Sequence, residues 1–156
     1  MKRLYFDMDG TVADLYGVPD WLSYLNAHDP RPYRTAAELV NMVRLECICN
    51  ELVALGWEIG VVTWLAKGSD EDYDEEVTSA KMDWVYDRMP YLFDFVAVPY
   101  GVPKQKAVKR CSEMWLVDDN AKIREMWDTP KQRKSIDANG DIIAALLELL
   151  RREKGE

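Results

Sequence analysis

The chain has 156 residues, of which 48% are hydrophobic, and its formal net charge at neutral pH is −8. This length and composition are typical of one globular domain, residues 1–156, and argue against a disordered chain. The acidic balance argues against nucleic acid as a partner, because such proteins bind through a basic surface. No apolar run approaches the roughly 18 residues of a membrane span, and no leader-like segment follows Met1. We therefore expect a cytoplasmic protein that does not bind a membrane.

Strand-like and helix-like patterns alternate along the chain. Short apolar runs bounded by turn residues predict strands, and apolar positions repeated every three or four residues predict helices. Helix starts are marked by a capping box at Thr35-Ala36-Ala37-Glu38, a similar signal at Ser69-Asp70-Glu71-Asp72, and Asp141. In chain order we expect a strand at 2–6, a helix from 35 to 55, a strand at 59–62, a helix from 69 to 88, a strand at 93–98, a helix at 103–110, a strand at 114–117, a helix at 121–127, an edge strand at 134–137 and a helix from 141 onward.

This alternation predicts an α/β fold. Strands separated by helices form right-handed βαβ units, so the sheet should be mostly parallel and covered on both faces. We expect a Rossmann-like three-layer sandwich around a mostly parallel, five-stranded sheet. Residues 14–34, with Gly17 and three prolines, indicate a small insertion after the first strand.

An acidic segment opens the second long helix. Residues 70–76 contain six acids. Negative charge is favourable at the positive end of a helix, which explains this placement without a ligand. A second cation site is the alternative.

Reactive side chains lie near strand ends and helix starts. Asp7-Met8-Asp9-Gly10-Thr11 follows the first strand, Thr63 follows the second, and Asp118-Asp119 follows the fourth. Lys104 and Lys106 lie at the helix that precedes the fourth strand. Because the carboxyl ends of parallel strands share one edge of a sheet, these residues should converge there although they are distant in sequence.

In order and spacing, these residues resemble the four motifs of the haloacid dehalogenase (HAD) superfamily, whose phosphatases carry DxDGT or DxDGV after the first strand. Lys106 stands 12 residues before Asp118, a spacing similar to that of the 5′-nucleotidase-like branch. The resemblance implies hydrolysis of phosphomonoesters through an aspartyl-phosphate intermediate. Asp7 would be the nucleophile, and Asp9 would act as general acid and then as general base.

The resemblance also implies a Mg²⁺ ion, because a carboxylate that attacks a dianionic phosphate needs a cation to offset the repulsion. The implied ligands are the Asp7 side chain, the Asp9 main-chain carbonyl and one acid of the fourth motif. Neighbouring side chains on an extended backbone diverge, so Asp118 and Asp119 should not both face one ion. The family pattern favours Asp119, with Asp118 as a reserve ligand.

Side-chain and backbone donors would hold the phosphate group. Thr63 would donate its hydroxyl, and the backbone N–H groups of Met8 and Trp64 would contribute. One lysine would balance the negative charge of the nucleophile and the phosphate. Spacing favours Lys106, and Lys104, nearer to the helix start, is the alternative.

Cap insertions largely determine the substrate in this superfamily. The insertions here are short, so the chain resembles a nearly capless or small-cap member. Tyr16, Trp21, Tyr24 and Trp64 could stack on a nucleobase or pack the loop. We expect nucleotides or other small phosphorylated metabolites as substrates. The alternatives are a non-catalytic HAD-fold module that binds phosphate or a partner, and a receiver-like signalling domain. The paired aspartates of the first motif argue against both.

Overall fold

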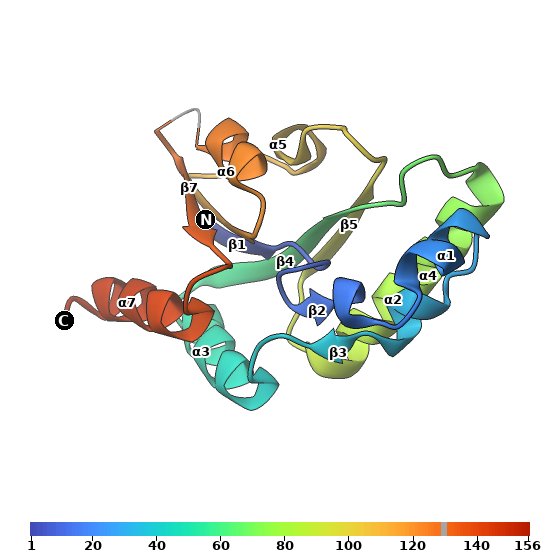
Figure 1. Ribbon diagram of the computed structural model, residues 1–156. Coiled ribbons are helices and arrows are strands. Elements are labelled where there is room, and N and C mark those ends of the chain that lie inside the picture. The colour runs from blue at the N-terminus through green and yellow to red at the C-terminus, as the bar shows by residue number, and fades with distance from the viewer. Residues whose placement is uncertain (129–130) are drawn as a thin grey trace.

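A five-stranded parallel sheet forms the centre of the molecule (Figure 1). The structure, a computed structural model, describes residues 1–128 and 131–156. The strand order is β5-β4-β1-β6-β7, and every neighbouring pair is parallel. The strands are β1 (Lys2–Phe6), β4 (Trp57–Trp64), β5 (Asp94–Val98), β6 (Glu113–Asp118) and β7 (Arg133–Asp137). The predicted α/β fold with a mostly parallel five-stranded sheet is confirmed.

Helices cover both faces of this sheet, so the molecule has three layers (Figure 1). The layer on one face consists of α3 (Met42–Ala54), α4 (Glu71–Arg88) and α7 (Ile142–Lys154). The layer on the other face consists of α5 (Lys104–Ala107) and α6 (Ala121–Trp127). Among the described helices, none combines the length and the apolar character needed to cross a membrane.

The central strand β1 connects the two layers. Leu4 and Phe6 are fully buried on the α3 side, whereas Tyr5 packs with the α6 side. Side chains on a strand alternate between its faces, so this short apolar segment serves both cores. The next residue, Asp7, still donates its backbone N–H to the Val117 carbonyl at 2.9 Å. The chain therefore leaves the sheet at its carboxyl edge with Asp7 firmly placed.

Short elements fill the segment between β1 and α3. They are β2 (Ala13–Asp14), η1 (Leu15–Gly17), α1 (Trp21–Asn26), α2 (Arg31–Thr35) and β3 (Ala37–Glu38). β2 and β3 pair in antiparallel orientation. Figure 1 shows α1 and α2 beside α4, and Tyr33 of α2 is buried there with Tyr73 and Val77. The segment thus lies next to the loops that follow β1 and β4.

The capping box expected at Thr35–Glu38 is wrong. Thr35 ends α2, and Glu38 pairs with Ala13 in the small antiparallel sheet. Asn41 caps α3 instead and accepts a hydrogen bond from the Arg44 N–H at 3.1 Å. The four-residue pattern is local, and pairing with a distant strand overrides it.

The other two predicted helix starts are confirmed. Asp70 accepts a hydrogen bond from the Tyr73 N–H, and Asp141 accepts one from the Ala144 N–H, both at 2.9 Å. Acids in the first turn of α4 then lie where the helix dipole favours negative charge. The helix expected at 103–110 is shorter in the structure, where α5 spans Lys104–Ala107.

Candidate active site

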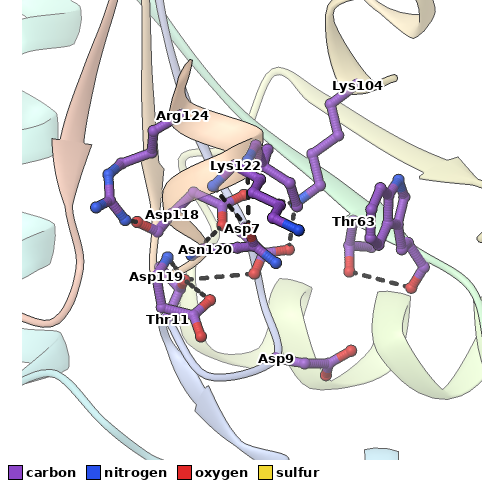
Figure 2. A network of polar contacts seen from close by, with 12 residues as sticks. Asp7, Asp9, Thr11, Thr63, Lys104, Asp118, Asp119, Asn120, Lys122 and Arg124 are labelled. Carbon is purple, nitrogen blue, oxygen red and sulfur yellow. Dashed lines mark hydrogen bonds and ion pairs between the residues drawn. The ribbon is translucent and has the colours of Figure 1, made fainter. Parts of the chain in front are cut away.

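Three carboxylates meet at the carboxyl edge of the sheet (Figure 2). Asp7 follows β1, Asp118 ends β6, and Asp119 comes next in the chain. Phe6 pairs with Val117 in the neighbouring strand, so the residues that follow each of them lie side by side. One oxygen from each of the three carboxylates lies within 4.8 Å of the others. The strand register therefore assembles the acids of the first and fourth motifs.

The loop after β1 holds the carboxylates of Asp7 and Asp119 in place. The Thr11 hydroxyl lies 3.3 Å from oxygens of both Asp7 and Asp119, and it accepts the Asp119 N–H at 3.2 Å. Gly10 has a φ of +81°, and a Cβ added there would lie 2.6 Å from Asp119 Oδ2. Glycine is therefore required twice at this turn, for its conformation and for the space it leaves beside Asp119.

Lys104 is the cation of this site. Its buried Nζ lies 2.6 Å from Asp7 Oδ1 and 2.7 Å from Asp118 Oδ2. Burial opposes the charged ammonium, but the two carboxylates outweigh it and raise the pKa of Lys104. The structure places Lys104 at these carboxylates, whereas Lys106, which spacing favoured, is exposed two residues further along α5. Two positions on a helix turn a side chain through roughly 200°, so only one of the two lysines faces the site.

The two acids of the fourth motif differ in their surroundings. Asp118 is fully buried, with Oδ2 bound to Lys104 and Oδ1 accepting the Asn120 N–H at 2.9 Å. Asp119 is half-buried, and one of its oxygens faces Gly10 rather than a cation. Protein partners thus occupy both oxygens of Asp118, which leaves Asp119 better placed to bind a metal ion.

The electrostatics of the carboxylate group favour a further positive charge. Burial, followed by the nearby Asp7, raises the pKa of Asp118 to about 6. The same two causes raise the pKa of Asp119. Lys104 offsets only part of this charge, and carboxylate oxygens are the ligands that Mg²⁺ prefers. The chemistry and spacing of the donor set therefore fit a hard divalent cation.

Asp9 lies apart from this group (Figure 2) and pairs with another lysine. Lys81 of α4 donates to Asp9 Oδ2 at 2.6 Å, to Thr63 Oγ1 at 2.8 Å and to the Trp64 carbonyl at 2.7 Å. Burial raises the pKa of Asp9, and Lys81 opposes that rise. Thr63, expected at the phosphate, is fully buried and contacts Lys81.

Sequence reasoning missed Lys81. A lysine in the middle of a charged helix normally points to solvent, yet Lys81 is fully buried. The available signal was helical spacing, because Lys81 stands four residues after Val77 and three before Trp84, both of which are buried. A lysine on the apolar face of a helix indicates a buried partner, and Asp9 is that partner.

A cavity of about 400 Å³ opens above these residues. The polar part of its lining consists of Asp7, Asp9, Asn26, Lys67, Lys104, Asp118, Asp119 and Asn120. The aromatic part of its lining consists of Tyr16, Trp21, Tyr33, Trp64 and Tyr100. The rings of Tyr16 and Trp21 are 5.0 Å apart, and those of Trp64 and Tyr100 are 4.9 Å apart. Charged and aromatic side chains therefore line the same cavity.

Met8 and Tyr24, two further residues predicted at the site, do not belong to the lining of this cavity. Met8 is in the core with its side chain 1% exposed, so it can reach the cavity only through its backbone. Tyr24, expected with the aromatic residues, has Arg31 over its ring at 4.9 Å. Of the four aromatic residues expected near the site, Tyr16, Trp21 and Trp64 line the cavity.

Comparison with known proteins supports the fold assignment. No family model and no curated protein sequence matches the chain. Among solved structures, the chain is similar to the D,D-heptose 1,7-bisphosphate phosphatase of Burkholderia thailandensis, with a TM-score of 0.54 and 13% identity. The match covers 96% of this chain and 99% of the other. At 13% identity this likeness concerns the fold alone, and it agrees with the α/β fold expected from the sequence.

Proposed function

We propose that the protein is a Mg²⁺-dependent phosphomonoesterase that works through an aspartyl-phosphate on Asp7. The arrangement around Asp7 carries this proposal. Its carboxylate lines the cavity, bound by Lys104 and next to Asp118 and Asp119. A carboxylate held in this way by a buried cation is oriented for attack on a phosphorus atom.

Lys104 and the acids would have separate roles in balancing the negative charge of the substrate. Lys104 has two described partners and lines the cavity, so its third N–H is directed at a substrate oxygen. Asp7, the Asp9 carbonyl and Asp119 would hold the metal ion, and Asp118 would keep Lys104 in place. When bound there, Mg²⁺ would offset the charge of the phosphate and of Asp7. The backbone N–H groups of Met8 and Trp64 would hold phosphate oxygens.

Asp9 would act as the general acid and then as the general base. As Asp7 Oδ forms its bond to phosphorus, the bond to the leaving oxygen breaks, and that oxygen takes a proton from Asp9. Asp9 then accepts a proton from the water that hydrolyses the aspartyl-phosphate, which restores both residues. The raised pKa of Asp9 suits a carboxyl group that must carry a proton in one step and lose it in the other.

The aromatic lining of the cavity bears on the choice of substrate. Tyr16, Trp21, Trp64 and Tyr100 offer flat surfaces in the same cavity as the carboxylates, as a nucleobase would require. The segment at about 14–34 supplies two of them and acts as the small cap-like insertion of a single domain. We propose nucleotides as the first substrates to test, with other small phosphorylated metabolites second. The similar solved structure is named for a sugar bisphosphate, so sugar phosphates complete the panel.

Phosphate release from this panel in the presence of Mg²⁺ tests the proposal. We expect turnover with at least one member and a loss of about a thousandfold or more in Asp7→Asn. Asp87→Asn, at an exposed carboxylate on α4, is the matched control and should retain activity. Full activity in Asp7→Asn would refute the nucleophile assignment. No release from any member would instead favour the non-catalytic phosphate-binding module.

A further inference from the structure

Lys81 is a buried lysine whose three N–H donors are all committed to the protein. Its Nζ binds Asp9, the Thr63 hydroxyl and the Trp64 carbonyl at 2.6 to 2.8 Å. An ammonium group has three donors, so none is left for a substrate. Lys81 does not belong to the cavity lining. Its influence on a reaction must therefore pass through its partners.

The comparison with Lys104 makes this distinction clear. Lys104 also lies buried, but two carboxylates are its partners, and it lines the cavity. Lys81 has one carboxylate partner, and its other two partners belong to the end of β4. Lys81 is thus anchored to a central strand of the sheet and directs its remaining donor at Asp9.

Asp9 needs such an anchor. Its side chain extends from the loop after β1, away from Asp7, and lies partly in the cavity. Oδ2 is bound to Lys81, which leaves Oδ1 as the oxygen that faces the cavity. Tyr33 of the inserted segment lies over the ammonium, with its ring centroid 4.9 Å from Nζ. The insertion therefore covers the Lys81 ammonium, while Asp9 stays partly open to the cavity.

We propose that Lys81 is a positioning residue for proton transfer. This inference rests on the proposed phosphatase function. Lys81 holds Asp9 Oδ2 against β4, so that Oδ1 points at the leaving oxygen and later at the attacking water. Without Lys81, Asp9 would lose this orientation.

The test compares two leaving groups in Lys81→Met and Lys81→Arg. The leaving group of an alkyl phosphate is a strongly basic alkoxide, which needs the proton from Asp9. The leaving group of p-nitrophenyl phosphate is a stable phenolate, which does not. In single-turnover measurements we expect Lys81→Met to lower phosphoryl transfer from the alkyl substrate by about a hundredfold and from the aryl substrate by less than about tenfold. Lys81→Arg should recover part of the alkyl rate. Equal losses with both substrates would overturn the inference, because a purely structural role would affect both alike.

Two further measurements keep the test decisive. If Lys81 acts through Asp9, adding Lys81→Met to Asp9→Asn should change the alkyl rate by less than about threefold, and a further loss of about a hundredfold would contradict the proposal. The double variant also removes both charges of the pair, so it should fold even where Lys81→Met alone does not.

A crystal structure of Lys81→Met supplies a readout that does not depend on turnover. We expect the Asp9 side chain to leave its position, and an unmoved Asp9 would refute the positioning role. Inactivity of the unmodified protein on every member of the phosphomonoester panel would refute the phosphatase proposal, and the crystal structure would still decide what Lys81 does. Lys109→Met, at an exposed lysine, is the control for the loss of one positive charge.

Discussion

Lys104 and Lys106 are close in sequence but differ completely in environment. Lys104 is 2% exposed and binds Asp7 and Asp118, whereas Lys106 is exposed on the same short helix. We expect Lys104→Met to lower kcat/KM by about a hundredfold or more, because it removes the cation that balances the nucleophile and the phosphate. Lys106→Met should stay within about twofold of the original value. Steady-state kinetics on p-nitrophenyl phosphate measures both.

Stability must be followed in the same pair of variants. Removing Lys104 leaves two buried carboxylates without their partner, which costs about 3–5 kcal/mol of the free energy of unfolding. Urea denaturation shows whether the loss of activity exceeds the unfolded fraction. A loss in Lys106→Met equal to that in Lys104→Met would mean that the cation of the site had been assigned incorrectly.

Gly10 supports the site through the space it leaves. Its φ of +81° and the 2.6 Å separation between Asp119 Oδ2 and the position of an added Cβ make two separate demands on this residue. Gly10→Ala should destabilise the fold by about 1–2 kcal/mol for the positive φ and by about 1–3 kcal/mol more for the clash. Gly56→Ala is the matched control, since Gly56 has a φ of +88° and no atom within 4 Å of an added Cβ. Urea denaturation of both variants isolates the clash, and equal losses would show that Asp119 moves aside freely.

At the scale of elements, α7 is attached to the sheet through Glu153. This carboxylate accepts hydrogen bonds from Lys2 of β1 at 2.5 Å and from the Trp57 indole at 3.0 Å. Burial alone would raise its pKa, but the hydrogen bonds from Lys2, Arg152 and Trp57 outweigh burial and lower the pKa to about 2. A carboxylate with a lowered folded-state pKa stabilises the fold above its ordinary pKa of about 4.3 and loses that contribution as the pH falls toward 2.

Glu153→Gln is therefore expected to destabilise the protein most at neutral pH. The difference in the free energy of unfolding between the original protein and Glu153→Gln should shrink as the pH falls from about 5 to about 3. Urea denaturation across this range measures it. Glu148→Gln, at an exposed glutamate of the same helix, should show a small and constant difference. A difference for Glu153→Gln that does not change with pH would contradict the role of its charge.

The order of strands and helices could be predicted from the sequence because buried strands and amphipathic helices have different periodicities. Asp7 and Asp118 could be placed together for a related reason, since parallel topology brings strand ends to one edge. The start of α3 could not, because the pairing of Ala13 with Glu38 depends on residues far apart in the chain. Nor could the choice of Lys104, because spacing alone does not show which side of a four-residue helix faces the site.

At the scale of the whole molecule, the concentration of acid at one edge predicts stabilisation by a divalent cation. A ligand that binds only the folded state adds about 2.7 kcal/mol at a concentration one hundred times its Kd. We expect Mg²⁺ to raise the midpoint of thermal unfolding of metal-free protein, and Asp119→Asn to lose most of this shift. Asp87→Asn, which removes the same charge elsewhere on the surface, should keep it. An undiminished shift in Asp119→Asn would remove Asp119 from the ligand set.

Both ends of the described chain lie at the opposite edge of the sheet from the carboxylates. Lys2 begins the central strand, and the Met1 backbone contacts Ser112 just before β6. α7 brings Glu153 to Lys2, so the last helix finishes at this same edge. An affinity tag or a surface attachment at either end would therefore project away from the cavity. Protein immobilised through either end should present the cavity and its carboxylates to solution.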